Sequence, residues 1–134
     1  MTVKIKEAIT LPKENYLYTD KKTNDEVMIN SIDENNFNSD VIDKHSKDKE
    51  SFVLYFSSDN CVFCEIIDKI LKNINTKNIY KINVSQNKKF ISKYLLRSTP
   101  TIMFFDNSLK LTKRIIGATN SNIKELNNIL KEYK

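Results

Sequence analysis

The sequence predicts an α/β protein with a central mixed sheet of four to five strands, flanked by helices on both faces. Apolar segments alternate between the two-residue period of strands and the 3.6-residue period of helices, in the order βαβαβαββα. Alternating elements favour parallel strands joined by right-handed crossovers. Only a short turn at residues 106–108 separates the last two strand segments, and this requires an antiparallel pair.

The first fifty residues carry the weaker pattern. Residues 1–25 are polar, and we interpret them as a loosely structured N-terminal extension of a domain that spans residues 26–134. The apolar run at residues 27–29 fits a short strand. A helix should follow, with Ser31 or Asp33 as its N-cap. Its apolar face consists of Phe37, Val41 and Ile42.

From residue 51 onward the pattern is clear. Residues 51–56 are almost all apolar, with β-branched and aromatic members, as in a strand buried on both faces. An amphipathic helix begins after Cys61 and extends to about residue 74. Residues 78–84 alternate in the manner of a strand, and residues 90–95 fit a short helix.

The C-terminal part predicts a hairpin and a closing helix. A strand over residues 100–105 begins at a proline, one of the few places where a sheet accepts that residue. A second strand over residues 109–116 ends at Gly117. The closing helix should then be capped by Asn120 or Ser121.

Length and composition restrict the class of protein. A chain of 134 residues suffices for one domain with its own core. One glycine and two prolines argue against a linker-rich or disordered chain. No apolar stretch reaches the ~20 residues of a transmembrane helix, and the N-terminus lacks the apolar core of a signal peptide. We therefore expect a cytoplasmic protein; an extracytoplasmic location stays open if a signal or anchor before Met1 has been removed.

A net charge of +5 raises the question of an anionic partner. Of the 22 basic residues only Arg97 and Arg114 are arginines, and the chain also contains 17 asparagines. This excess of Lys and Asn indicates a compositional bias, since a phosphate-binding surface would favour the forked guanidinium group. Acidic residues are interspersed among the lysines. We therefore expect a solvated basic surface and no nucleic-acid partner.

The two cysteines, Cys61 and Cys64, are separated by two residues. A disulfide across so short a loop constrains a fold little, so the spacing suggests a metal site or redox chemistry. A zinc site needs four ligands, and the chain offers only His45, sixteen residues before Cys61, so we expect no metal. His45 itself is interpreted as a surface or capping residue. A pair of inert buried thiols and a purely structural disulfide both stay open.

The position of the cysteine motif favours redox chemistry. It follows a buried strand and opens a helix, whose first turn has unpaired N–H groups and partial positive charge. Both effects stabilise a thiolate, so we expect the pKa of Cys61 to lie below the ~8.5 of free cysteine. Cys64 lies on the same face one turn later and should be more buried. Cys61 would thus attack a disulfide and Cys64 would resolve the mixed disulfide, with no cofactor.

With these features the chain resembles the thioredoxin superfamily over roughly residues 27–134. The resemblance rests on the CxxC motif, on Thr99–Pro100 at the start of a later strand, and on Gly117 after the hairpin. It implies a thioredoxin fold in which the peptide bond before Pro100 is cis and faces the cysteines. It also implies that the backbone of Thr99 pairs with an extended substrate segment.

The expected substrate-binding residues are Thr99, Pro100, Val62, Phe63 and Gly117. Phe63, a large apolar residue between the cysteines, is expected to be exposed and to contact a partner protein. Packing on its own domain is the alternative for this side chain.

Several positions depart from the family pattern. Asn60 replaces the common tryptophan, and Val62–Phe63 replaces Gly-Pro between the cysteines. Tyr55 stands where thioredoxins carry a buried acid that accepts the proton of the resolving thiol. Lys81 matches the lysine beside that acid, and without the acid we interpret it as a solvated strand residue. These differences should slow resolution by Cys64 and change the reduction potential.

The sequence therefore predicts a thiol–disulfide oxidoreductase that exchanges disulfides with protein substrates through Cys61 and Cys64. The alternative is a thioredoxin-fold accessory or binding module, for example of a secretion system, with secondary redox activity. A glutaredoxin-like enzyme that uses glutathione is the third reading. We expect protein thiols or disulfides and a reductase or oxidant as partners, no membrane span, and a monomeric protein.

Overall fold

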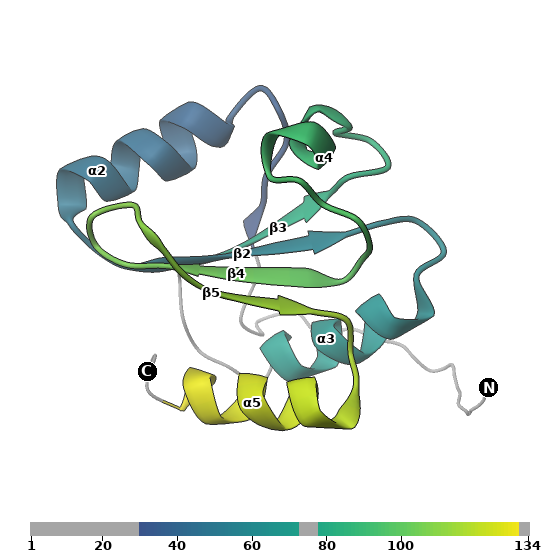
Figure 1. Cartoon of the computed structure of the whole chain (residues 1–134). Helices are drawn as coiled ribbons and strands as arrows, with labels where there is room; N and C mark the ends of the chain where they lie inside the picture. The colour runs from purple at the N-terminus through teal and green to yellow at the C-terminus, as the bar shows by residue number, and fades with distance from the viewer. Residues whose placement is uncertain (1–29, 73–77, 132–134) are drawn as a thin grey trace.

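A computed structural model describes residues 30–72 and 78–131 of the chain. Five strands form one sheet in the order β1-β3-β2-β4-β5 (Figure 1). The strands are β1 (Asn30–Ser31), β2 (Phe52–Ser57), β3 (Ile79–Asn83), β4 (Thr101–Phe105) and β5 (Leu111–Ile116). β1 and β2 run parallel to β3, whereas β4 is antiparallel to both β2 and β5. The predicted α/β class, the mixed sheet and the terminal hairpin are confirmed.

β2 is the middle strand of the sheet, between β3 and β4, and both of its faces are covered. All six of its residues are buried, as the unbroken apolar run predicts. In the sheet register Tyr55 lies between Lys81 of β3 and Ile102 of β4. The carboxyl end of β2 therefore delivers the chain to the cysteine motif from a fixed position.

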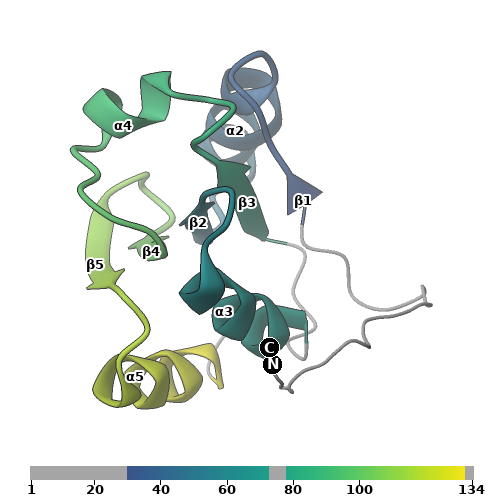
Figure 2. The ribbon, with the colours of Figure 1, turned by 90° about the vertical axis from the view of Figure 1, so that its right-hand side faces the viewer.

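Helices cover both faces of the sheet (Figures 1 and 2). One face carries the π-helical stretch η2 (Asn38–Asp43), α2 (Lys44–Asp48) and α4 (Lys89–Lys93). The opposite face carries the two eleven-residue helices α3 (Val62–Lys72) and α5 (Asn120–Leu130). Apolar side chains fill the space on each side, so the molecule has two core clusters separated by the sheet.

Two local predictions are wrong. His45 is fully buried, not a surface or capping residue; its Nδ1–H donates to the backbone carbonyl of Glu50 and its Nε2 accepts from the hydroxyl of Tyr80. Burial lowers the pKa of His45, because the charged ring is poorly solvated there. The N-cap of α5 is Thr119, whose side chain accepts from the N–H of Asn122, so the helix begins just after the residue that caps it.

The predicted strand at residues 27–29 and the N-terminal extension at residues 1–25 lie outside the described residues. Within residues 30–72 and 78–131, no helix is long and apolar enough to cross a membrane.

Candidate active site

Cys61 and Cys64 form a disulfide at the start of α3, directly after the loop that leaves β2. The N–H of Cys64, in the first turn of the helix, donates to Cys61 Sγ at 3.1 Å and also to the backbone carbonyl of Cys61 at 3.2 Å. Cys64 is 4% exposed, whereas Cys61 is half-buried. This asymmetry makes Cys61 the sulfur that an incoming substrate can reach.

The loop before Cys61 is held to the end of β3. Asn60 adopts a left-handed backbone with φ 57°, a conformation that asparagine tolerates better than most residues. The N–H of Asp59 donates to Ser85 Oγ, and Asn83 donates from its side chain to Asp59 Oδ1. Asn60 is thus a residue suited to the turn that precedes the cysteine pair.

Thr99 and Pro100 lie beside the sulfur of Cys61. The bond between them is cis, and the hydroxyl of Thr99 donates to Cys61 Sγ at 3.6 Å. Ser58 Oγ lies 2.6 Å from Thr99 Oγ1. A hydroxyl has one proton, so when Thr99 donates to the sulfur, Ser58 must donate to Thr99. Ser58, which sequence analysis does not single out, therefore orients the Thr99 hydroxyl that donates a hydrogen bond to Cys61 Sγ.

Gly117 lies next to this turn. Its N–H donates to the carbonyl of Pro100 at 2.9 Å, and its own carbonyl accepts from the side chain of Asn122. The φ of Gly117 is +88°, which other residues adopt only with strain. The glycine thereby holds the start of β4 against the loop that leads into α5.

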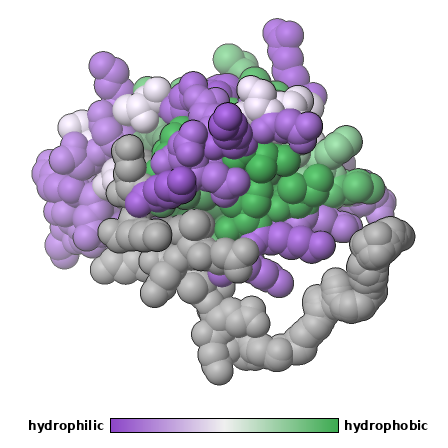
Figure 3. Space-filling model, turned by 90° about the horizontal axis from the view of Figure 1, so that it is seen from below, coloured by the Kyte–Doolittle hydropathy of each residue, from purple (hydrophilic) through white to green (hydrophobic). Residues whose placement is uncertain are grey.

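The surface around Cys61 is apolar. Val62 and Phe63 are 69% and 58% exposed, and Ile66 and Ile116 are also exposed. Figure 3, seen from below, shows apolar surface among hydrophilic residues on the side that carries α3 and α5. Exposed apolar side chains of α3 therefore begin directly after Cys61.

A hollow of about 350 Å³ opens beside Thr99, which forms part of its wall. Its walls are mostly apolar, and Lys88 and Arg97 are exposed at its edge. The walls include Ser58, Val84, Ile91, Leu96 and Thr99. Thr99, whose hydroxyl contacts Cys61 Sγ, is part of the wall of this hollow.

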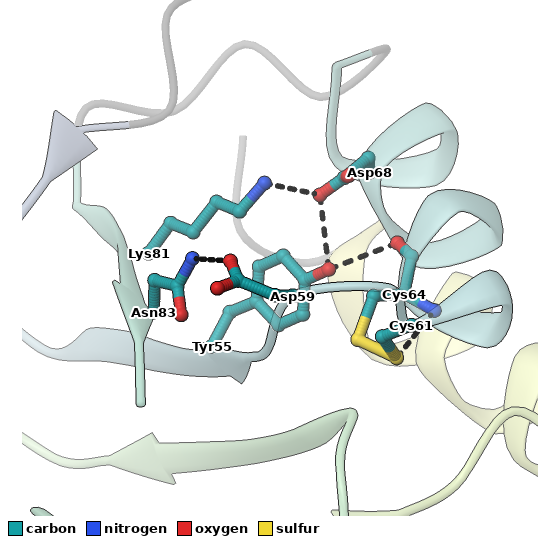
Figure 4. A network of polar contacts seen from close by, with 7 residues as sticks. All are labelled: Tyr55, Asp59, Cys61, Cys64, Asp68, Lys81 and Asn83. Carbon is teal, nitrogen blue, oxygen red and sulfur yellow. Dashed lines mark hydrogen bonds and ion pairs between the residues drawn. A yellow bond between two sulfur atoms is a disulfide. The ribbon is translucent and has the colours of Figure 1, made fainter. Parts of the chain in front are cut away.

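A second polar network lies behind Cys64 (Figure 4). The hydroxyl of Tyr55 lies 2.9 Å from the carbonyl of Cys64 and 2.9 Å from Asp68 Oδ1, and its single proton is shared between these two acceptors. Lys81 Nζ donates to the same oxygen of Asp68 at 3.0 Å. Burial, with the neighbouring charge of Asp68 and the hydrogen bond to it, raises the pKa of Tyr55, so the phenol remains a donor.

This network corrects the interpretation of Lys81, which pairs with an acid and is not a simply solvated strand residue. The acid in this network, Asp68, belongs to α3 and contacts both Tyr55 of β2 and Lys81 of β3. Asp68 was missed, although it follows Cys64 by four residues and so lies on the same face of the helix.

Among the described residues, no group of three His, Cys, Asp or Glu side chains lies close enough together to hold a metal ion. Both cysteines are used in the disulfide. The buried ring of His45 lies in the core cluster of the opposite face, against Phe52 and Tyr80.

Comparisons with known proteins agree with this geometry. The family model for thioredoxin matches residues 28–132. A thioredoxin from Rickettsia prowazekii is 31% identical over 81 residues, covering 60% of this chain and 77% of that protein. One from Buchnera aphidicola is 28% identical over 99 residues, covering 70% of this chain and 88% of that protein.

Solved structures show the same fold. The crystal structure of a thioredoxin from Nicotiana alata superposes with a TM-score of 0.68 at 15% identity, covering 85% of this chain and all of that one. A thioredoxin from Malassezia sympodialis gives a TM-score of 0.62 at 18% identity, covering 84% of this chain and 96% of that one. At these identities the likeness concerns the fold alone.

Proposed function

Because this chain belongs to the thioredoxin family and is a thiol–disulfide oxidoreductase with its redox pair at Cys61 and Cys64, we propose that it acts on disulfides of proteins. The observation that supports this substrate class most directly is the exposed apolar surface around the half-buried Cys61. A small disulfide would need no such surface. A folded or extended polypeptide would bury it on binding.

The exchange balances as follows in the reducing direction. The thiolate of Cys61 attacks one substrate sulfur, the substrate S–S bond breaks, and the other substrate sulfur leaves with the electron pair and takes up a proton. Cys64 then loses its proton and attacks Cys61 Sγ. The Cys61–Cys64 bond forms, the second substrate sulfur leaves and is protonated, and the substrate has gained two electrons and two protons.

Substrate docking uses the residues around Cys61. An extended substrate segment pairs with the backbone of Thr99 ahead of β4 and passes between Pro100 and Gly117 on one side and Val62 and Phe63 on the other. Phe63 supplies the apolar contact that the loop lacks without a tryptophan. The hollow beside Thr99 receives a substrate side chain.

The experiment compares a protein disulfide with a small one. We expect catalysis of insulin reduction by dithiothreitol, and its loss in Cys61→Ser. Phe63→Ala should lower kcat/KM for insulin about fivefold or more, since truncating an interface anchor costs 1 kcal/mol or more, and should leave the rate with a small aromatic disulfide nearly unchanged. Equal losses with both substrates would show that Phe63 shapes the redox pair and does not bind proteins.

The accessory-module alternative makes a different prediction in the same assay. A module with only secondary redox activity would reduce insulin no faster than buffer containing dithiothreitol, even with both cysteines intact. The family match and the intact redox pair favour the enzyme.

We further propose a reductase or an oxidant as redox partner, a monomeric state and a cytoplasmic location. The reduction potential of the Cys61–Cys64 couple separates the two directions of transfer. A potential near ~ −270 mV would indicate a reductant, and one near ~ −120 mV would indicate an oxidant.

A further inference from the structure

The Tyr55–Asp68–Lys81 network raises the question of where the proton of Cys64 goes. Cys64 is buried and must lose a proton before it can attack Cys61. In the family pattern the acceptor is an acid on the central strand, and that position is Tyr55 here. Burial raises the pKa of Tyr55, so its phenol is not a base near neutral pH.

Asp68 is the carboxylate nearest in position to Cys64 on the inner side of α3. Residues four apart on a helix lie on the same face with Cβ atoms about 5–6 Å apart, so Asp68 and Cys64 are neighbours on α3. Figure 4 shows the Asp68 carboxylate above the cysteine pair, with the hydroxyl of Tyr55 between it and the carbonyl of Cys64. The carboxylate is thus held by β2 on the helix face that carries Cys64.

The groups around Asp68 come from three elements. Tyr55 of β2 donates a hydrogen bond, Lys81 of β3 donates another, and Cys64 precedes it on α3. Asp59 in the loop before α3 is also acidic, but it accepts from Asn83 at the edge of the network. These two donors, one of which is the cation Lys81, hold the Asp68 side chain in place, and among the described residues both contact only its Oδ1.

We propose that Asp68 accepts the proton of Cys64 through one water molecule, so that α3 supplies the base that β2 lacks. When Cys64 attacks Cys61 of the mixed disulfide, its S–H bond breaks and the proton passes to the free oxygen of Asp68. The Cys61–Cys64 bond forms and the substrate sulfur leaves with the electron pair. Asp68 then releases the proton to the leaving thiolate or to solvent.

A merely electrostatic role for Asp68 would have the opposite sign. A fixed negative charge near Cys64 disfavours the thiolate, so removing it would make Cys64 a better nucleophile at neutral pH. A merely structural role would change the rate by the same factor at every pH. The direction of the effect and its pH dependence therefore separate the three roles.

The test follows the second thiolate released when the reduced protein reacts with a chromogenic aromatic disulfide, because that release is the attack by Cys64. In Asp68→Asn the amide oxygen still accepts from Tyr55, while the base is lost. We expect its release rate to fall on the order of tenfold to a hundredfold at pH 7, since a general base contributes ~10²–10⁴-fold and solvent replaces part of it. The difference in rate between Asp68→Asn and the wild type should disappear at pH values above ~8.5, the pKa of a free thiol, because Cys64 then ionises without a base.

Three further variants complete the design. Asp68→Glu should recover much of the neutral-pH rate, because it restores the carboxylate. Tyr55→Phe should lose part of the rate, because the carboxylate is then held only by Lys81. Glu65→Gln removes an exposed carboxylate from the same helix and should leave the rate unchanged.

The proposal is overturned if Asp68→Asn reacts as fast as the wild type or faster at pH 7, or if its deficit is the same at every pH. The result does not depend on protein substrates, because the chromogenic disulfide is small. Failure of insulin reduction together with a pH-dependent deficit in Asp68→Asn would reject the substrate class and leave the base assigned.

Discussion

The two faces of the sheet are built from different side chains. The face under η2, α2 and α4 is aromatic. The rings of Phe37 and Phe90 lie edge to face with centroids 5.0 Å apart, and those of Phe52 and Phe105 are stacked with centroids 4.8 Å apart. The face under α3 and α5 is mainly aliphatic, with Tyr55 and Cys64 as its polar members.

The difference follows from what each face carries. The helix α4 has only five residues, so it is too short to be stable alone and depends on tertiary packing, whereas η2 continues directly into α2 as one helical segment. Large rings supply that packing with few residues. The longer α3 and α5 leave room for the redox pair and its polar partners. One face thus contributes mainly stability and the other mainly chemistry, and substitutions can test this division.

Phe52→Ala should have the largest effect on stability. Its ring is buried on the aromatic face against Phe105 and His45, so truncation should lower the free energy of unfolding by about 3–5 kcal/mol. The measurement is urea denaturation of the oxidised protein. Phe63→Ala on the other face is the matched control, because an exposed ring should cost less than about 0.5 kcal/mol. Similar losses in the two variants would contradict the division.

His45 should make the aromatic face sensitive to pH. Burial lowers the pKa of His45 in the folded protein. At pH values below ~6.5, the pKa of an unfolded histidine, the unfolded state therefore binds more protons than the folded state. This part of the stability is present above pH 6.5 and is lost as the pH falls through the lower value of the folded state. His45→Gln should cost about 1–3 kcal/mol at pH 7.5 through impaired pairing with Tyr80 and Glu50. The cost should shrink at pH 5.5; a cost that is the same at both pH values would contradict it.

Gly117→Ala should perturb the site face through the backbone. Nothing lies closer than 4.0 Å to a Cβ built there, so the effect arises from the positive φ. We expect a loss of about 1–2 kcal/mol in urea denaturation. The insulin rate should fall as well, because Gly117 holds the carbonyl of Pro100. Unchanged stability would show that the loop relaxes to another conformation.

Thr99→Val should have a smaller effect, confined to the sulfur. It removes the hydroxyl that donates to Cys61 Sγ, and a thiolate loses more from this than a disulfide does. In the reduced protein the ultraviolet titration midpoint of the Cys61 thiolate should rise by about 0.5–1 pH unit, equivalent to about 0.7–1.4 kcal/mol.

Ser58→Ala completes a double-mutant cycle with Thr99→Val. Alone it should raise the same midpoint by less, because it only orients the Thr99 hydroxyl. In the Thr99→Val background it should change nothing, since no donor is left to orient. A shift of equal size in both backgrounds would mean that Ser58 acts on Cys61 by another route.

Patterns within single elements account for the predictions that the structure confirms. The apolar run at residues 51–56 predicts the buried β2, and the short turn at 106–108 predicts the antiparallel β4–β5 pair. The exposure of Phe63 follows from its place between two cysteines at a helix start. These features depend on neighbours within one or two turns of chain, so the sequence contains them.

Contacts between elements explain the errors. His45 is buried because β2 and β3 bring Phe52 and Tyr80 against it, and no local period reveals that. Lys81 looked solvated because its partner lies on another element thirteen residues earlier in the chain.

The sequence by itself determined the class of sheet, the order of its elements and the pair of sulfurs at a helix start, because periodicity and spacing are local properties. Only the tertiary structure decided which side chains serve those sulfurs. Ser58 meets Thr99 across 41 positions, and Tyr55 meets Asp68 because β2 packs beneath α3. Hydrogen bonds of this kind depend on the packing of separate elements, which the order of residues along the chain does not display.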